Sequence, residues 1–98
     1  MPLQMRTYTI NRGALHDFAQ EWTQTIKPLR EKIGFDIPAA WTAAETNQFI
    51  WLMHHSGPET WESLDQAFHQ HPERRAMNPT PARHIARMEN HFIETVPS

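Results

Sequence analysis

The sequence contains no cysteine, which excludes disulfides, thiolate nucleophiles and thiolate metal sites. It also has no glycine-rich phosphate loop, no nucleophile elbow and no dinucleotide-binding fingerprint. The chain therefore lacks the short local motifs by which many enzyme classes are recognised. Any chemistry has to come from residues that lie apart in the sequence.

Clustered charge is also missing. Nine lysines and arginines stand against eleven aspartates and glutamates, for a net charge of −2 without a run of either sign. This balance argues against nucleic acid as a partner, which requires a clustered basic face. The nearest approach is Arg74 and Arg75 with Arg83 and Arg87, and we interpret these residues as solvated surface.

Long apolar runs are absent as well. No stretch approaches the length of a membrane span, so no transmembrane segment is expected, and the first residues lack the apolar core of a signal peptide. We expect a cytoplasmic protein. Its 98 residues predict a single domain, 1–98, at the small end of the usual range.

What is present is a strand without a polar face. Residues 47–55 have the length and the aromatic content of a strand. Phe49, Trp51 and Met53 point to one face, and the two aliphatic residues between them point to the other. A strand that is apolar on both faces needs cover on both. The predicted helices provide one cover, and we expect a second copy of the chain to provide the other.

The remaining chain alternates between strand and helix patterns. An apolar stripe at helical spacing runs from Leu15 to Ile33, where Pro28 predicts a bend and Gly34 a stop. Pro58 is suited to the first position of a second helix, and Pro38 predicts an edge strand. The predicted elements are strand 3–10, helix 14–33, strand 35–43, strand 47–55, a helix from 58 with a further turn at 72–77, a short helix to about 87, and strand 88–96.

This order, β-α-β-β-α-β, predicts an α+β protein with the ferredoxin-like plait. In that plait an antiparallel four-stranded sheet carries both helices on one face. We expect the first and last strands not to be neighbours. The open face predicts a homodimer in which two sheets pack together and close into a barrel-like pair.

Several short segments are distributed along the chain: Arg6-Thr7-Tyr8-Thr9-Ile10 before Gly13, Trp22 and Pro28-Leu29-Arg30, Trp41-Thr42 followed by Asn47, and Glu89, Phe92-Ile93 and Pro97. Together they span nearly the whole chain, and they resemble the NIPSNAP family. This resemblance implies membership of the dimeric α+β barrel superfamily, which also includes cofactor-free monooxygenases, isomerases and larger haem enzymes.

The sequence departs from that pattern in two places. Relatives commonly have His, Leu and Trp in the central strand, where this chain has Trp51, Leu52 and Met53. They usually have an arginine near the position of Trp61. Roles tied to that histidine or arginine are therefore not carried over, and the family implies no single agreed chemistry.

Arg6 and Tyr8 are the first candidate site residues, because they share a face of the first strand. We expect this face to point away from the helices, toward the partner's sheet or an interior cavity. An arginine there binds a carboxylate or enolate, and the tyrosine hydroxyl donates a proton or a hydrogen bond. The alternative is a structural ion pair, for example between Arg6 and Glu89.

Glu89 and His91 likewise share a face of the last strand, where a histidine beside a carboxylate could act as a general base. The alternative is that both are partly exposed residues near a sheet edge. Trp41 and Trp51 lie on adjacent strands and are expected to face the cavity as an aromatic pair, with core or interface packing as the alternative.

No metal site and no cofactor are expected. His54 and His55 are consecutive on a strand, and His69 and His71 are two apart on a helix, so neither pair shares a face. The sequence thus predicts a NIPSNAP-like homodimer of unassigned activity that binds a small aromatic or apolar molecule between its sheet and the partner. One alternative is a cofactor-free monooxygenase or isomerase using Tyr8, Arg6 and His91. Another is a non-enzymatic interaction or scaffold module.

Overall fold

A computed structural model of the protein describes residues 2–97. Its elements follow the predicted order of strands and helices. They are β1 (Leu3–Ile10), α1 (Leu15–Glu21), η1 (Trp22–Ile26), α2 (Lys27–Ile33), β2 (Ala40–Ala43), β3 (Gln48–His54), α3 (Trp61–Gln70), α4 (Pro72–Arg75), η2 (Pro81–His84) and β4 (Ile85–Ile93).

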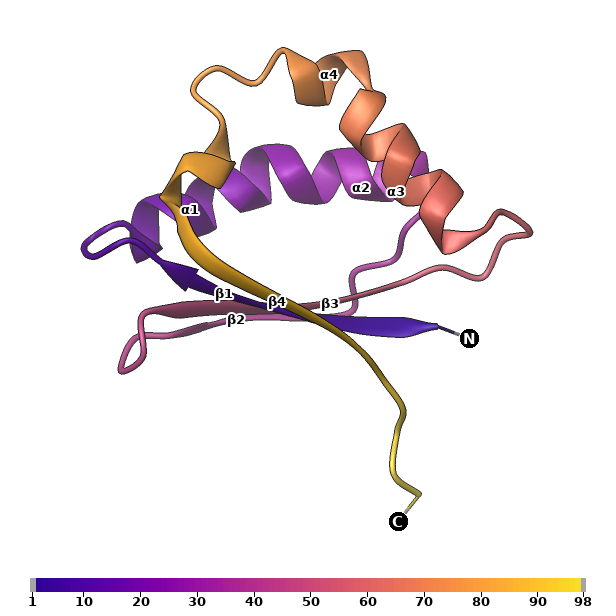
Figure 1. Ribbon diagram of the computed structural model, residues 1–98, viewed down its shortest axis with the longest axis horizontal. Helices are drawn as coiled ribbons and strands as arrows, with labels where there is room; N and C mark the ends of the chain where they lie inside the picture. Colours follow the sequence, from indigo (N-terminus) through magenta and orange to yellow (C-terminus); the bar gives the residue numbers. More distant parts are fainter. Residues whose placement is uncertain (1, 98) are drawn as a thin grey trace.

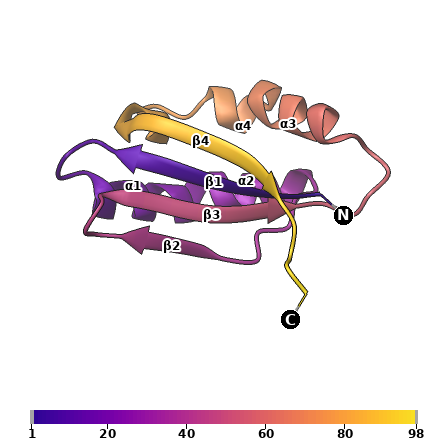
Figure 2. The ribbon, with the colours of Figure 1, turned by 60° about the horizontal axis from the view of Figure 1, so that its bottom comes forward.

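The four strands form one antiparallel sheet in the order β2-β3-β1-β4. All helices lie on one face of this sheet, and the other face is open (Figures 1 and 2). The predicted α+β plait is therefore confirmed. The expectation that the first and last strands are not neighbours is wrong, because β1 pairs with β4 along its whole length. Pro38 precedes β2, which is an edge strand as predicted.

The long first helix contains a π-helical turn. The α-helical segments α1 and α2 are joined by η1, in which the Lys27 backbone N–H donates to the Trp22 carbonyl five residues earlier. Pro28 follows directly, and it has no N–H to donate. The wider turn lets the helix continue past this proline. It ends as predicted at Gly34, whose φ of 134° is unfavourable for a residue with a side chain.

Three predicted boundaries need correction. The second helix begins at Trp61 rather than Pro58, because Thr60 caps it by accepting a hydrogen bond from the Ser63 N–H at 3.1 Å. The second strand shrinks to β2, preceded by an isolated bridge between Asp36 and His54. The last strand runs over 85–93 instead of 88–96, since η2 ends earlier than expected.

The core lies between the sheet and α1, η1 and α2. Phe49, Trp51 and Met53 face these helices, and Trp51 is completely buried. The ring of Trp22 packs against those of Phe49 and Trp51, with centroid distances of 4.8 Å and 5.3 Å. The predicted alternation of β3 is therefore confirmed. Trp61 is only partly buried.

The open face carries the intervening residues of each strand. In register across the sheet its apolar residues, all half-buried or exposed, include Leu3, Met5, Trp41, Ile50, Leu52 and Ile93, and about as many of its residues are polar, among them Thr7, Thr9, Glu89 and His91. After β4 the chain leaves the sheet and extends on this side, away from the helices (Figure 1). Among the described residues, no helix is both long and apolar enough to cross a membrane.

Candidate functional site

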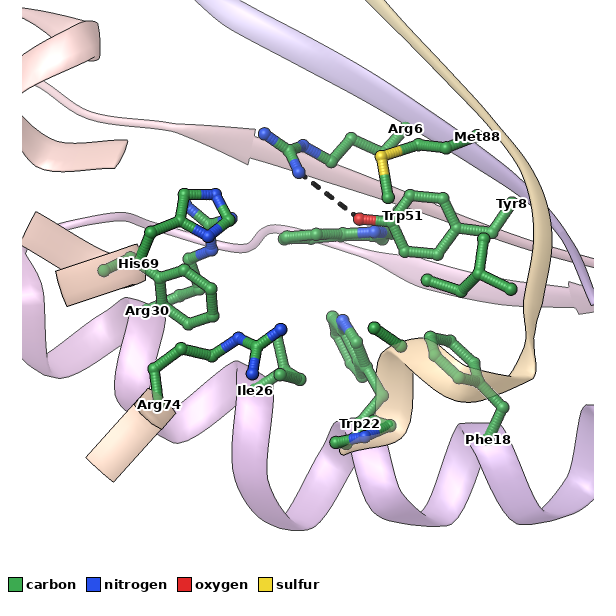
Figure 3. A pocket seen from close by; sticks show the side chains of 14 residues that line it. Arg6, Tyr8, Phe18, Trp22, Ile26, Arg30, Trp51, His69, Arg74 and Met88 are labelled. Atoms are coloured by element: carbon green, nitrogen blue, oxygen red, sulfur yellow. Dashed lines mark hydrogen bonds between the residues drawn. The ribbon is translucent and has the colours of Figure 1, made fainter. Parts of the chain in front are cut away.

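A cavity of about 70 Å³ lies between the sheet and the helices. Its walls come from β1, β3, the long first helix, α3, α4, η2 and β4, which converge here from all parts of the chain (Figure 3). The lining residues are Arg6, Tyr8, Phe18, Trp22, Ile26, Arg30, Trp51, Phe68, His69, Arg74, Pro81, Ala82, Ile85 and Met88.

The side chains of Arg6 and Tyr8 point into this cavity from β1. They are almost completely buried beneath the helices. They lie in an interior cavity, one of the two predicted directions, but the expectation that their face points away from the helices is wrong, and Met5, Thr7 and Thr9 occupy the open face instead. Because Arg6 and Tyr8 are polar, the sequence suggested that they lie on the face away from the helices. The helices decide it, because α3 supplies Asp65 as a partner for Arg6 and α1 packs the Phe18 ring against Tyr8.

Arg6 is held by three side chains. Its Nε donates to Gln4 Oε1 at 2.7 Å, its Nη1 donates to the Tyr8 hydroxyl at 3.3 Å, and its Nη2 lies 3.6 Å from Asp65 Oδ1. The guanidinium also lies over the Trp51 ring, 5.5 Å from its centroid. The suggested ion pair with Glu89 is not formed, since β4 places Asn90 opposite Arg6 and turns Glu89 to the other face.

Arg30 enters the cavity from α2 and is 2% exposed. Its Nη1 lies 2.6 Å from Asp65 Oδ1, and its guanidinium stacks on Phe68 at 3.7 Å from the ring centroid. Burial and the nearby charge of Arg6 lower the pKa of Arg30. Burial by itself would raise the pKa of Asp65, but the hydrogen bond from Arg30 and the two arginine charges outweigh it, so this pKa is lowered.

Arg74 and His69 complete the polar lining on the helix side. His69 is half-exposed, and its Nε2 lies 3.7 Å from Asp65 Oδ2. Burial lowers the pKa of His69, Asp65 opposes this shift, and Arg30, Arg74 and Arg6 reinforce it. The lowered pKa favours the neutral imidazole near neutral pH. Arg74 is half-buried on α4, with its guanidinium 5.8 Å from the Phe68 centroid.

Four buried nitrogens of the lining have no hydrogen-bond partner within the described residues. They are Trp22 Nε1, Arg30 Nε, Trp51 Nε1 and Arg74 Nε. Each of these atoms is a donor and cannot accept. An unpartnered buried donor costs free energy, so the cavity as it stands is rich in donors and poor in acceptors.

Other predicted site residues lie elsewhere. Trp51 lines the cavity. Trp41 pairs with Ile50 and not with Trp51, so it lies on the open face, where it is 51% exposed. The two tryptophans are therefore not a pair. Glu89 and His91 also share the open face, with Glu89 Oε2 3.8 Å from His91 Nε2. They do not reach the cavity.

Residues that the sequence reasoning missed include Arg30, Asp65, His69 and Arg74. The first three could have been found from their helical spacing in the sequence. Arg30 follows Trp22 and Ile26 at intervals of four, and Asp65 and His69 follow Trp61 in the same way. Polar residues inside an apolar stripe mark a buried site. Arg74 is on a short helix of four residues and had no such signal.

Among residues 2–97, no group of three or more histidines, aspartates or glutamates is placed to hold a metal ion. The cavity's polar groups are guanidinium, indole, phenol and imidazole. Guanidinium groups and indole N–H groups donate hydrogen bonds and cannot bind cations as ligands. The arrangement suits an acceptor-bearing organic molecule.

Solved structures share this fold. A NIPSNAP domain protein from Burkholderia xenovorans superposes with a TM-score of 0.82 at 18% identity, covering 100% of this chain and 95% of that one. A NIPSNAP family protein from Agrobacterium tumefaciens gives 0.85 at 12% identity, covering 97% and 92%. A protein named antibiotic biosynthesis monooxygenase gives 0.66 at 10% identity, covering 99% and 100%. At these identities the likeness concerns the fold.

The sequence itself was also compared with known proteins and families. No curated protein matches it significantly. The family model described as NIPSNAP matches residues 3–98, almost the whole chain. Together with the shared fold, this match shows that the chain belongs to the NIPSNAP family.

Proposed function

We propose that this NIPSNAP protein, acting as one domain, binds a small, partly aromatic molecule in the cavity between its sheet and its helices. The observation that carries the proposal is the convergence of Arg6, Tyr8 and Trp51 on this cavity. These are three of the four residues expected from the sequence to contact a ligand. The site belongs to one protomer and does not lie between sheet and partner.

The shape and the chemistry of the walls support this proposal. Ligand sites are concave, mostly apolar, and contain a few convergent polar groups. Here the rings of Phe18, Trp22 and Trp51 provide flat apolar walls, while Arg6 and Tyr8 provide polar groups at one end. Flat walls of this kind suit a planar group of the ligand.

Blocking the cavity tests the proposal. Ala82 is an exposed residue of the lining, so Ala82→Phe should fill the entrance without disturbing the buried core. We expect indole, p-cresol or benzoate to raise the melting temperature of the wild type, because a ligand of the folded state stabilises it. Ala82→Phe should abolish that rise. Ala76→Phe, an exposed residue outside the lining, is the matched control.

Unchanged melting temperatures with all three probes would contradict ligand binding and favour the non-enzymatic interaction or scaffold module. Equal ligand responses in Ala82→Phe and the wild type would place the binding site elsewhere. The cytoplasmic location stays a prediction from the sequence, and fractionation of cells that express the protein would test it.

We further propose that the protein is a homodimer through the open face of the sheet. This face carries Trp41 and Ile50 in register with each other, and both are accessible to a partner. The chain after β4 extends past the same face, and its Val96 is 84% exposed. A second copy would cover all of these apolar groups. Light scattering should give twice the chain mass of 11.5 kDa, and a monomer at micromolar concentration would contradict the proposal.

A second candidate function is that of a cofactor-free monooxygenase or isomerase. The observation that favours it is the buried hydroxyl of Tyr8, which accepts a hydrogen bond from Arg6 Nη1. Its own proton then remains available for a ligand oxygen. Arg6 would also stabilise negative charge that develops on an enolate or phenolate. A protein of the same fold is named a monooxygenase.

Turnover assays with the matched variants would test this candidate. Given a substrate, Tyr8→Phe should lower kcat by about a hundredfold, the usual effect of removing a general acid or base. His91→Ala, on the open face and exposed, should leave kcat unchanged. Equal turnover in Tyr8→Phe and the wild type would exclude Tyr8 as the proton donor.

A further inference from the structure

We infer that the cavity holds the carboxylate group of a small aromatic acid, with Arg30, Arg74 and the indole N–H groups of Trp22 and Trp51 as its donors. This inference rests on the proposed function and names the class of ligand. It brings in two arginines, Arg30 and Arg74, that the sequence did not predict as site residues.

The lining of the cavity is positively charged. Three arginines and no acidic side chain line the cavity within the described part of the chain. The adjacent Asp65 contacts two of them, Arg6 and Arg30. One carboxylate shared between two guanidinium groups leaves positive charge uncompensated. A bound anion would complete the pairing that buried charges require.

The cavity is also rich in hydrogen-bond donors. Within residues 2–97, four of the buried side-chain atoms without a partner are obligate donors, and all four belong to lining residues. The others are Nδ1 atoms of His54 and His55, which become acceptors in one tautomer. The donors come from η1, α2, β3 and α4. Only the tertiary structure brings these elements together around the cavity, where an acceptor would satisfy the donors.

The three arginines of the lining differ in their hydrogen bonds. Arg6 already uses Nε on Gln4 and Nη1 on Tyr8, so its role is to orient and to supply charge. Arg30 and Arg74 have Nε groups without partners. A carboxylate has two oxygens with about four lone-pair directions, so one such group could accept from both arginines and from an indole N–H.

The size of the cavity limits what it can hold. A cavity of about 70 Å³ accommodates a few heavy atoms, since a single water needs roughly 10–15 Å³ measured in this way. The anionic head therefore occupies the enclosed part. The ring lies toward Ile85 and Met88 at the edge of the site, where Met88 is 46% exposed. A planar carboxylate between aromatic walls fits this space better than a tetrahedral phosphate.

Paired ligands test the inference by changing only the charge. Benzoate and benzamide have nearly the same shape, and their binding is measured through the intrinsic fluorescence of the four tryptophans, two of which, Trp22 and Trp51, line the cavity. We expect benzoate to bind about tenfold more tightly or better, since hydrogen bonds to charged groups are the stronger ones. Phenyl phosphate, the tetrahedral anion, should bind more weakly than benzoate.

Matched variants test whether Arg74 donates to the carboxylate. Arg74→Met keeps the length of a half-buried side chain that makes no hydrogen bond within the described residues, so the fold should tolerate it. We expect it to weaken benzoate binding about tenfold and to leave benzamide binding unchanged. Arg75→Met, an exposed neighbour on α4, is the control and should bind like the wild type. Circular dichroism of both variants checks that they fold.

The outcomes separate the two proposals. Equal affinities for benzoate and benzamide would overturn the carboxylate inference and leave aromatic binding intact. Tighter binding of phenyl phosphate would overturn the choice of a carboxylate. Unchanged benzoate affinity in Arg74→Met would remove Arg74 from the site. Failure of benzoate, benzamide and neutral indole to bind would overturn both this inference and the proposed function.

Discussion

At the scale of single residues, Asp65 is the shared partner of the two buried arginines Arg6 and Arg30. Its carboxylate lies 2.6 Å from Arg30 Nη1 and 3.6 Å from Arg6 Nη2, and so joins α3 to α2 and to β1. Two nearly buried guanidinium groups depend on this single anion. Removing it would leave their charges facing each other in a poorly solvated interior.

The variant Asp65→Asn should therefore destabilise the fold. We expect a loss of about 3 kcal/mol in the free energy of unfolding, the lower end of the range for breaking a buried pair, because the Asp65 side chain is 30% exposed. Urea denaturation measures this loss. Glu62→Gln, an exposed residue on the same helix, is the control and should change stability by less than about 0.5 kcal/mol.

The stability that Asp65 contributes should also depend on pH. The folded-state pKa of Asp65 lies below its ordinary value of 3.8. Its charge therefore stabilises the fold fully above about pH 4, and the contribution is lost as the pH falls further through the folded-state pKa. The stability difference between the wild type and Asp65→Asn should shrink below pH 4. A difference that stays constant from pH 6 to pH 3 would contradict this assignment.

At the scale of elements, Glu21 ties the long first helix to η2. It accepts from Arg83 Nη1 and Nη2 at 2.8 Å and 3.0 Å, and it lies 3.1 Å from His84 Nε2. The hydrogen bonds from Arg83 lower the pKa of Glu21. Since Pro81 and Ala82 of η2 line the cavity, this contact holds one wall of the site in place.

We predict that Glu21→Gln loosens that wall. It should cost about 1 kcal/mol in stability, the upper part of the range for exposed ion pairs, because the contact with Arg83 is bidentate. The backbone N–H of Arg83, which donates to the Thr80 carbonyl, should exchange with solvent faster. Asp17→Asn, exposed on the same helix, should leave this exchange rate unchanged.

The sequence pattern predicted the extent of the long first helix but not its internal geometry. The apolar stripe from Leu15 to Ile33 predicted one long helix, and the structure has three consecutive helical segments over that range. The pattern could not indicate the π-helical turn before Pro28, because the apolar spacing hardly changes there. Likewise Thr60, not Pro58, begins α3, since only the threonine hydroxyl can accept a hydrogen bond from the helix N-terminus.

At the scale of the whole molecule, the sheet separates two environments. Its helix face encloses the polar core and the cavity, and its open face presents Trp41, Ile50 and Leu52. Exposed aromatic and aliphatic groups on a flat sheet favour association with another sheet. The proposed dimer makes a direct prediction about this face.

Trp41→Asp should weaken the proposed dimer. Trp41 is half-exposed in the protomer, so the variant should still fold, while a charge buried between two sheets costs about 3 kcal/mol and lowers the dimer affinity by about a hundredfold. Sedimentation at several concentrations measures the change. Ala44→Asp, in the exposed turn that follows β2, is the control. Equal dissociation constants for both variants would place the interface elsewhere.

The sequence by itself determined the order of the strands and helices and the residues that share each strand face, such as Arg6 with Tyr8 and Phe49 with Trp51. These properties depend on periodicity and on local side-chain preferences. It could not determine which strand face lies beneath the helices, because alternation is symmetric between the two faces. The tertiary structure decided this, since Asp65 and the aromatic rings on the helices meet Arg6 and Tyr8 there. It also separated Trp41, Glu89 and His91 from the cavity and brought in Arg30, His69 and Arg74.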